Sequence, residues 1–571
     1  MRWRPPRGER PTRRKGPLPH QGPAALDPGD GPDPGGWGIS PGDRFWLLGV
    51  IFALMVVTTT PYGLAWLRQG EAWRFTGFLL GVEDGNSYIA KMLLGRSGAW
   101  LFRSPYTLMP QTGYLLFGPY LALGKLARWP GDVHTQLVIL FHLFRLGALV
   151  ALTLAVYRFS ALFVPRGRWR RWAVGLILAG SGWDWVLLPW GRAAWGAADG
   201  PPSLISPESY GFLALFFLPH VALARALLLD VLARGLSGAG SRTTAWMMAL
   251  ETAGMVWVHP LEAVPWLLAV GLLVGLRWVV PRRERAELSL RSLVRWAKPW
   301  LPAGVVALGA LGYLVALQRD PYVRLWTAQN RLPAPPVWVY LVGYGGLLPG
   351  WVAAWPEVRR RWHQGKATLL WLAAWAVVAV GLAVAPVPIQ RRLIEGAWVG
   401  WVLMAMVGAA RWATTERRRW GAMLALTPAF VAPALLLWGG FRVANSPALP
   451  AFRPTAEVQA FSALARRASP GDGVLAAYAT GNALPAWAPV RVPLGLGPES
   501  APWSDNEALV QTVLCGQGSS AQRLARLRTY GVRWVFFGPA ERALGHWNPA
   551  EEPWLRQRYA AQGYALFEVV P

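Results

Sequence analysis

Cysteine is almost absent from this sequence, and charged residues are scarce. Cys515 is the single cysteine among 571 residues, which excludes a disulfide framework or a zinc-ligand cluster of cysteines within one chain. Only 15% of the residues are charged, whereas a soluble domain averages about 25%. The chain therefore lacks the charge needed to cover a water-facing surface.

Apolar residues take the place of the missing charge. They make up 53% of the chain, and they recur in runs of roughly 20 residues, each long enough to cross a ~30 Å hydrocarbon layer. Tryptophan is abundant, with 36 residues, and its amphipathic ring favours the membrane interface. These features predict a membrane protein with many spans.

Acidic residues are also few, at 30 against 57 basic residues, and the net charge is +27. We exclude nucleic acid as a partner because the basic residues lie in short runs between apolar spans, which is the positive-inside pattern of membrane proteins. The main basic runs are Arg166 to Arg171, Arg277 to Lys298, Arg359 to Lys366 and Arg411 to Arg419.

Placing these basic runs in the cytoplasm predicts an all-α polytopic membrane domain over residues 44–441, in the inner or cytoplasmic membrane. Residues 1–43, rich in Pro, Gly and Arg, are predicted to be a disordered basic cytoplasmic tail. About eleven crossings put the N-terminus inside and the C-terminus outside. The expected spans are 45–66, 134–163, 172–190, 210–234, 244–259, 261–280, 298–317, 336–355, 367–386, 392–410 and 420–441. Residues 113–128 are apolar but short, and we interpret them as a re-entrant or interfacial helix within or beside the first outer loop, 67–112.

Residues 442–571 are predicted to form a small extracytoplasmic α/β domain. Helix-like stretches at 458–467 and 520–530 alternate with strand-like runs at 474–478, 533–537 and 565–570. The domain carries no Gly-rich phosphate loop and no recognisable catalytic triad. Its Gly481-Asn482 and Pro498-Glu499 turns either cover the membrane site or simply connect elements.

Ionisable residues at membrane depth are costly, so those in this sequence are functional candidates. The predicted topology collects most of them on the outer side, and His220 lies deeper, inside a span. They are Glu83, Asp84, Glu208, His220, His259, Glu262, Arg391, Arg392 and Glu395.

The first outer loop resembles that of the GT-C glycosyltransferases, multi-spanning enzymes that use polyprenyl-phosphate-linked sugars. Protein mannosyltransferases and aminoarabinose transferases belong to this superfamily, and the remaining motifs are similar to a bacterial branch of it. The Lys-Pro-Pro-Leu stretch of the aminoarabinose type is absent, so the donor and the acceptor stay open. The matching spacing is that of Asp84, Tyr88, Ala90, Met92, Gly98, Trp100 and Pro110.

This resemblance implies a cell-envelope enzyme that transfers a sugar from a polyprenyl-phosphate donor to a glycan, lipid or protein acceptor. Asp84 would be the general base, with Glu83 as a second carboxylate or a ligand, alongside Asp84, of a divalent metal such as Mg or Mn. Arg391 and Arg392 would hold the lipid phosphate, with Lys91 and Arg103 as further candidates. The substrate-binding candidates are Glu208, His220, His259, Glu262 and Glu395.

Structural roles remain open for the same residues. Glu83 and Asp84 fit a solvated helix cap, Arg391 and Arg392 fit the lipid headgroup layer, and His220 fits a buried hydrogen-bonded histidine. The rival function is non-catalytic: a transporter or flippase for lipid-linked glycans, or an assembly factor. Because a transporter concentrates ionisable pairs near the bilayer midplane, the outer placement favours the enzyme.

Overall fold

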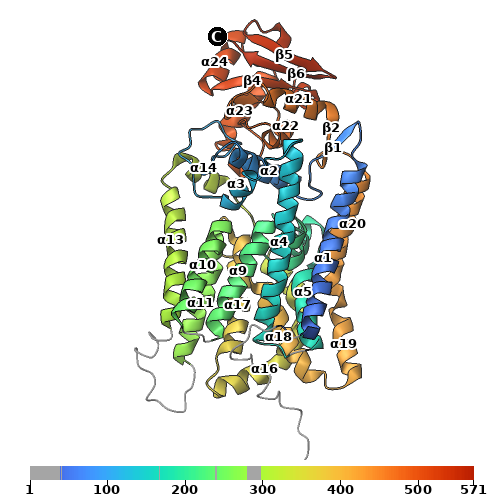
Figure 1. The fold of residues 1–571 in the computed structure, drawn as a ribbon, viewed down its shortest axis with the longest axis vertical. Coiled ribbons are helices and arrows are strands. Elements are labelled where there is room, and N and C mark those ends of the chain that lie inside the picture. Colours follow the sequence, from blue (N-terminus) through green and yellow to red (C-terminus); the bar gives the residue numbers. More distant parts are fainter. Residues whose placement is uncertain (1–38, 40, 166, 238–240, 280–296, 571) are drawn as a thin grey trace, which may run out of the picture.

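The computed structural model describes residues 39, 41–165, 167–237, 241–279 and 297–570. Long helices run side by side along the long axis, and a smaller domain with a β-sheet covers one end (Figure 1). The expected tail lies outside the described residues except at its end, where the first helix begins at Pro41 rather than at residue 44. Most of the expected basic loop between Arg277 and Lys298 also lies outside them.

Fourteen α-helices build the bundle within the described residues. They are α1 (Pro41–Arg68), α4 (Val133–Ala161), α5 (Arg168–Ala179), α8 (Gly211–Phe217), α9 (Pro219–Leu236), α10 (Arg242–Val258), α11 (Ala263–Val279), α13 (Leu301–Leu317), α15 (Val337–Gly345), α16 (Leu348–His363), α17 (Thr368–Leu382), α18 (Ala397–Trp412), α19 (Glu416–Leu426) and α20 (Val431–Asn445). Short 3-10 segments extend several of them: η2 (Asp184–Trp190), η3 (Pro260–Glu262), η5 (Lys298–Trp300), η6 (Gln390–Ile394) and η7 (Thr427–Phe430).

Seven of these helical runs, counted over the described residues, are long and apolar enough to cross a membrane. The count becomes eight if α15 and α16 form one span, but an angle of 81° separates them. The span expected at 336–355 therefore stays a prediction, because the chain turns sharply between Gly345 and Leu348 and the bent pair is either a broken span or a re-entrant loop. Three further expected spans, at 210–234, 244–259 and 367–386, coincide with α8 and α9 together, with α10 and with α17. These helices are short or carry internal charges, so eleven crossings remain a prediction.

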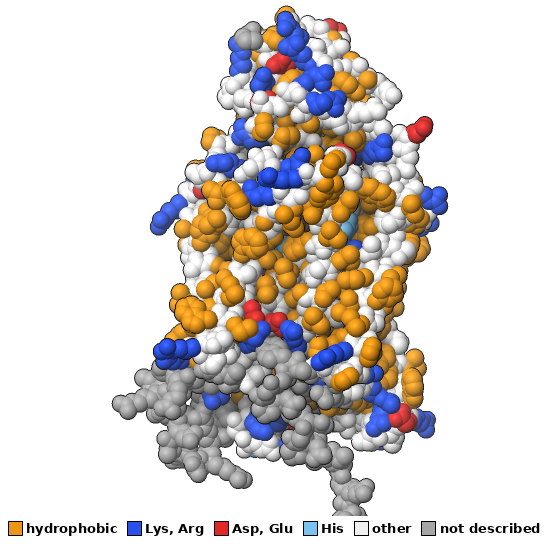
Figure 2. All heavy atoms as spheres, in the orientation of Figure 1, with side chains coloured by type: hydrophobic (Ala, Val, Ile, Leu, Met, Phe, Trp, Pro, Cys, Tyr) orange, Lys and Arg blue, Asp and Glu red, His pale blue; other side chains and the backbone are white. Residues whose placement is uncertain are grey.

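A belt of exposed apolar residues marks the part of the bundle that contacts lipid. Figure 2 shows hydrophobic side chains over the middle of the visible face, with charged side chains gathered toward both ends. Phe52, Leu250 and Val305 are among the most exposed apolar residues of the bundle. Water would penalise such a surface, so this belt and the apolar helices identify an integral membrane protein.

The C-terminal domain holds a four-stranded sheet in the order β3-β4-β6-β5. Strand β3 runs parallel to β4, and the other neighbours are antiparallel. This confirms the three predicted strands, whereas β5 was not predicted. The strands are β3 (Gly473–Leu475), β4 (Val532–Phe537), β5 (Leu555–Ala561) and β6 (Tyr564–Val569), with helices α21 (Thr455–Ala465), α22 (Tyr478–Ala483), α23 (Trp503–Leu514), α24 (Ser520–Thr529) and α25 (Pro539–Arg542) and 3-10 segments η8 (Leu484–Ala486), η9 (Gly497–Glu499) and η10 (Pro549–Glu551).

Short elements fill the space between the bundle and the C-terminal domain (Figure 1). Strand β1 pairs with β2 and so ties the first outer loop to the chain that enters the C-terminal domain. Helix α3 covers the interfacial segment 113–128 only in part, and with seven residues it is too short to span a membrane. These elements are β1 (Trp73–Phe75), α2 (Val82–Arg96), α3 (Gly118–Gly124), α14 (Pro321–Gln329) and β2 (Phe452–Pro454). Two further short helices, α6 (Arg192–Trp195) and α7 (Pro202–Ile205), pack against η2.

Candidate active site

Helix α2 places the predicted catalytic carboxylates, because Glu83 and Asp84 lie in its first turn. The helix begins after Gly81, whose φ of 55° is in the left-handed region that favours glycine. A Cβ on Gly81 would lie 2.6 Å from the Phe217 ring, and one on Gly85 would lie 2.2 Å from Phe78. The two glycines thus allow the start of α2 to lie directly on the bundle.

Asp84 is exposed at the start of α2, and no described residue forms a hydrogen bond or an ion pair with its carboxylate. Although solvent reaches it, surrounding protein atoms crowd it, and this desolvation raises the pKa of Asp84 above the ordinary value. The nearby charges of Arg392 and Lys91 act in the opposite direction. A free carboxyl with a raised pKa is a stronger base than an ordinary aspartate.

Glu83 faces a different neighbour. Its Oε2 accepts a hydrogen bond from the Tyr478 hydroxyl at 3.0 Å, and burial raises the pKa of Tyr478 to about 12. No group of three or more His, Cys, Asp or Glu side chains that could hold a metal ion gathers within the described ranges. The two carboxylates have different surroundings, so they do not fit the shared metal site that we expected from Glu83 and Asp84.

Two histidines connect α2 with the helices beneath it. The Tyr88 ring of α2 lies 5.3 Å from the His220 ring, and the His220 ring lies 5.7 Å from the His259 ring. Tyr120 of α3 also bonds His220, with 2.8 Å between its hydroxyl and Nδ1. His259 Nδ1 lies 3.4 Å from Oε1 of the buried Glu262. Three of the predicted substrate-binding residues are therefore neighbours.

Arg392 is the cation whose charge reaches most of these groups. Its charge acts on Asp84, Tyr88 and both histidines, and its Nε lies 3.9 Å from Glu208 Oε1. We call Asp84, Tyr88, His220, His259 and Arg392 the Asp84 cluster. It combines one free carboxylate with one guanidinium and two imidazoles, and its members come from α2, α9, the α10–η3 junction and η6.

Arg225 of α9 fixes two segments near the Asp84 cluster: the loop that carries Glu208 and the 3-10 segment η6 that carries Arg392. Its buried guanidinium pairs with Glu395, with 2.8 Å between Nη2 and Oε2. The same Nη2 donates to the carbonyls of Pro207 at 2.6 Å and Glu208 at 3.2 Å. Glu395 directly follows η6, so this pairing fixes the segment that carries Arg392. The structure thus gives Glu395 a positioning contact rather than an open binding position.

Arg391 differs from its neighbour in having no described partner for part of its guanidinium. The side chain is only 9% exposed, and its Nε and Nη1 are buried without a hydrogen-bond acceptor in the described protein. Its charge acts on Tyr340 of α15, whose buried hydroxyl also lacks a partner. A buried cation without an acceptor is costly, so this position is suited to an anionic ligand.

The other two cations predicted to bind phosphate contact protein groups. Lys91 is buried and pairs with Glu499 of η9 at 2.8 Å, and its ammonium lies 4.4 Å from the centre of the Phe117 ring. Glu499 also accepts a hydrogen bond from Ser104 at 2.7 Å. Arg103 is exposed and donates to the carbonyls of its own loop at residues 111 and 112. These contacts give both side chains a structural role.

We call the buried contacts between α2 and the C-terminal domain the seam: Lys91 with Glu499, and Asn86 with Asn482 at 2.8 Å. Glu499 and Asn482 come from the two segments that we predicted to be turns, Pro498-Glu499 and Gly481-Asn482. The turn at Gly481-Asn482 is wrong, because both residues lie within helix α22, whereas Pro498-Glu499 lies in η9. Both segments are fastened to α2 by buried hydrogen bonds.

Sequence reasoning missed Arg225, Glu499 and Tyr120. Arg225 carried a usable signal, because an arginine within an apolar run of membrane length needs a partner. Tyr120 gave none, since a tyrosine beside a membrane is ordinary, and Glu499 was named only as part of the Pro498-Glu499 turn, without its partner. Glu499 bonds Lys91 and Tyr120 bonds His220, and these partners lie 408 and 100 positions away in the chain, so no local pattern indicates the contacts.

Neither a protein-family model nor a curated protein matches the chain. Solved structures of an oligosaccharyltransferase from Archaeoglobus fulgidus align with it. AglB in complex with an inhibitory peptide and a dolichol-phosphate aligns at 12% identity and a TM-score of 0.49, covering 87% of this chain and 70% of that chain. The form tethered to an acceptor peptide aligns at 13% identity and 0.48, covering 86% and 69%. Alignments at this level establish neither a family nor an activity.

Proposed function

We propose that the protein is a membrane glycosyltransferase of the GT-C type. It would transfer a sugar from a polyprenyl-phosphate donor to a hydroxyl or amide of an acceptor at the outer face of the membrane. One observation carries the proposal: Asp84, at one end of a membrane bundle, has no hydrogen-bond or ion-pair partner among the described residues, its pKa is raised by desolvation, and the charge of Arg392 acts on it. A general base requires such a carboxylate, and the phosphate that leaves with the polyprenyl chain is stabilised by a cation such as arginine.

The proposed reaction needs a base for the acceptor and a cation for the leaving group. Asp84 accepts the proton of the acceptor group as its oxygen or nitrogen forms a bond to the anomeric carbon of the sugar. The bond between that carbon and the phosphate oxygen breaks, and the electron pair stays on the polyprenyl phosphate. The sugar is oxocarbenium-like between these events, and the neighbouring charges stabilise that state.

Arg391 and Arg392 are the proposed phosphate-binding pair. The buried, unpartnered Nε and Nη1 of Arg391 can donate two hydrogen bonds to phosphate oxygens. Arg392 is about one third exposed and has only a 3.9 Å contact with Glu208, so a phosphate can replace that carboxylate. Polyprenyl chains are apolar, and the exposed apolar belt of the bundle provides a lipid environment for the tail.

Transfer of label tests the proposal directly. Purified full-length protein is mixed with polyprenyl-phosphate sugars labelled in the sugar and with a membrane extract that supplies acceptors. We expect transfer by the unmodified protein and by Asp505→Asn, which removes an exposed carboxylate of α23. Asp84→Asn should abolish it while donor binding persists. Equal transfer by Asp84→Asn in folded protein would contradict the mechanism and favour the transporter or assembly-factor alternative.

A further inference from the structure

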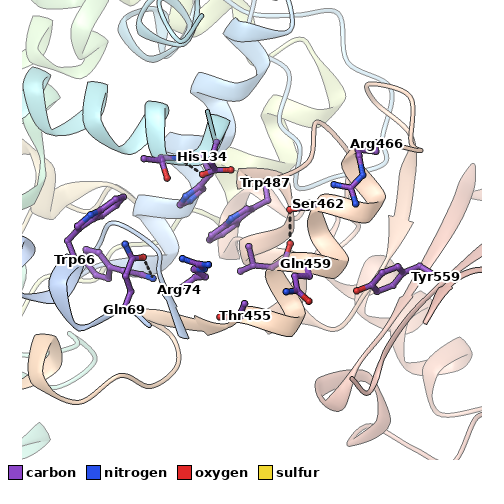
Figure 3. Close-up of a pocket in the computed structure, with 14 residues that line it drawn as sticks. Trp66, Gln69, Arg74, His134, Thr455, Gln459, Ser462, Arg466, Trp487 and Tyr559 are labelled. Atoms are coloured by element: carbon purple, nitrogen blue, oxygen red, sulfur yellow. Dashed lines mark hydrogen bonds between the residues drawn. The ribbon is translucent and has the colours of Figure 1, made fainter. Parts of the chain in front are cut away.

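A groove lies between the bundle and the C-terminal domain. Its volume is about 630 Å³. Its walls come from the end of α1, strand β1, the start of α4, helix α21, the segment after η8 and strand β5. Figure 3 shows the lining residues spread from Trp66, past Arg74 and Gln459, to Tyr559. The site is elongated, so it fits an extended ligand rather than a single small group.

Aromatic rings and polar side chains dominate this lining, and Val458 is its single aliphatic side chain. Trp66, Phe75, Trp487 and Tyr559 supply apolar faces, and the Trp487 ring stacks on His134 at 3.8 Å with an interplanar angle of 7°. Such faces pack against the C–H surfaces of sugar rings. The side chains that can bond sugar hydroxyls are Gln69, Thr135, Thr455, Gln459 and Ser462.

Two arginines give the groove a preference for negative charge. Arg74 of β1 and Arg466, which follows α21, both line it, and neither guanidinium forms an ion pair with any described residue. Asp132 is the single acidic side chain in the lining, and its carboxylate accepts a hydrogen bond from the Thr135 amide at 2.8 Å, which caps α4. The arginines are therefore available to carboxylate or phosphate groups of a ligand.

Unsatisfied polar atoms also occur in the walls. His134 is only 6% exposed, and its Nε2 has no hydrogen-bond partner within the part of the chain that the structure describes. Thr455 Oγ1 is likewise buried and unpartnered there. Buried polar atoms in native proteins are normally paired, so a polar ligand would complete the hydrogen bonding of this site.

We infer that the groove binds an extended acidic oligosaccharide. A lipid headgroup would contact only the end near Trp66, whereas the lining continues along α21 to Tyr559 in the sheet. A peptide would use aliphatic pockets or a strand edge, but one aliphatic residue lines the groove and β5 contributes only Tyr559. Aromatic faces, hydroxyls, amides and two free guanidiniums together match an acidic sugar chain.

The groove is joined to the Asp84 cluster through one short segment. Tyr478, which bonds Glu83, begins α22, and Asn482 of the same helix bonds Asn86 of α2. Trp487, a wall of the groove, follows directly after η8. An oligosaccharide held here lies next to the catalytic helix, so it is suited to be the acceptor. That role rests on the proposed function, whereas binding itself does not.

Direct binding tests the inference without any catalysis. Full-length protein in phosphatidylcholine nanodiscs is titrated with a galacturonate tetrasaccharide and with its methyl ester, which has the same shape but no charge. We expect the acidic probe to bind more tightly. Arg74→Gln with Arg466→Gln should weaken it about tenfold or more, because each loses a charge-assisted hydrogen bond. The methyl ester should be affected little.

Matched variants show whether a loss of binding is specific to the groove or follows from any loss of positive charge. Arg528→Gln with Arg556→Gln removes two exposed arginines elsewhere on the C-terminal domain and should leave both affinities unchanged. Tyr559→Leu should weaken both probes, because it removes a stacking face. The Asp84→Asn variant should bind both probes as well as the unmodified protein does. Binding in the groove is therefore tested independently of the glycosyltransferase proposal.

Three results would overturn the inference. They are absence of binding by the acidic probe, an equal loss in the Arg528/Arg556 control, and equal affinity for a tetraglutamate peptide, which would indicate a peptide site. A fourth arm uses nanodiscs that contain phosphatidylglycerol. Displacement of the acidic probe by this lipid, lost in the Arg74/Arg466 variant, would instead assign the groove to a lipid headgroup.

Discussion

Helix α2 carries two charged regions with opposite properties. At its first turn, the Asp84 cluster holds a carboxylate without a hydrogen-bond partner in the described protein, and the Arg391 guanidinium next to Arg392 is partly unpartnered. Two turns later, the seam holds Lys91, which is buried and bonded to Glu499 and Ser87. The same helix thus presents free charge at one position and fully paired charge at the next.

This is the difference that we expect between a reactive site and a structural one. Pairing a buried charge offsets its desolvation but leaves nothing for a substrate. Leaving a charge unpaired raises the free energy of the protein, and this is expected where a ligand or a transition state supplies the partner. We therefore assign chemistry to the Asp84 cluster and attachment of the C-terminal domain to the seam.

The largest expected effect is on the rate at the Asp84 cluster. Asp84→Asn keeps the shape of the side chain and removes the proton acceptor. Loss of a general base typically lowers the rate by roughly 10²–10⁴-fold. Label transfer at saturating donor measures this loss, with Asp505→Asn as the control. If the rate of the folded Asp84→Asn variant fell by less than about tenfold, the proposed difference between the Asp84 cluster and the seam would be contradicted.

The next effect is on stability at the seam. Lys91→Met leaves Glu499 buried without its cation, and breaking a buried pair costs about 3–5 kcal/mol. The midpoint of thermal unfolding of the full protein in detergent should fall clearly. Lys91→Met with Glu499→Leu should recover much of the loss, because no unpaired charge then remains.

An exposed pair provides the control for the seam. Arg533 lies 3.3 Å from Glu568 on the sheet, and exposed pairs contribute only about 0–1 kcal/mol. Arg533→Met should therefore change the midpoint little. Equal destabilisation by Lys91→Met and Arg533→Met would show that the seam does not hold the domain through this ion pair.

Much of the membrane architecture could be predicted from the sequence, because apolar runs and basic loops are local signals. The predicted helices and strands of the C-terminal domain also occur, since their turns and apolar patterns are local. The sharp turn after Gly345 had a local signal that the prediction did not use, because Gly345, Gly346 and Pro349 lie within residues 336–355 and favour a break in a helix. The pairing of Arg225 with Glu395 was not predictable, because it joins residues 170 positions apart in the chain.

The candidate site was predictable in part for the same reason. Asp84 and Arg392 could be found because charge next to an apolar span is expensive and therefore conspicuous. Their mutual proximity depends on tertiary packing. Lys91 was a further candidate beside Arg391 for the same phosphate, and only the position of Glu499 shows that Lys91 is paired.

Substitution of Arg391 should weaken ligand binding without lowering stability, which is the reverse of what we expect at the seam. Arg391→Ala should weaken binding of a polyprenyl-phosphate sugar about tenfold or more, because it removes a charge-assisted contact with phosphate. It should not destabilise the protein as Lys91→Met does, since its buried nitrogens have no protein partner to lose. Arg324→Ala, an exposed arginine of α14, is the control. A large fall in the unfolding midpoint of the Arg391→Ala variant would show that Arg391 stabilises the protein rather than binding a ligand.

The pH dependence follows from the raised pKa of Asp84, which desolvation increases while Arg392 and Lys91 oppose it. The base works only when ionised, so the rate should rise with pH through a pKa above that of an ordinary aspartate. A carboxyl whose pKa is raised on folding stabilises the protein at low pH, and this contribution is lost as pH rises through the folded pKa.

Asp84→Asn tests this pH dependence, because it removes both the base and the cost of ionising it. Its unfolding midpoint relative to the unmodified protein should therefore increase from acid to neutral pH. A difference that stays constant over this range would contradict a raised pKa.

The smallest expected effect is at Glu83, which adjoins Asp84 but does not share its surroundings. The Glu83 carboxylate is exposed and, among the described residues, bonds only the Tyr478 hydroxyl, and a carboxylate in the first turn of a helix contributes about 0.3–1 kcal/mol. Glu83→Gln should therefore lower transfer only a few-fold, and Tyr478→Phe should have a similar effect because it breaks the same hydrogen bond. Treatment with a chelator should not lower the rate further. If Glu83→Gln were as damaging as Asp84→Asn and added Mg²⁺ or Mn²⁺ partly restored its rate, the two carboxylates would share a metal, and the charge on the leaving phosphate would no longer be neutralised by the arginines alone.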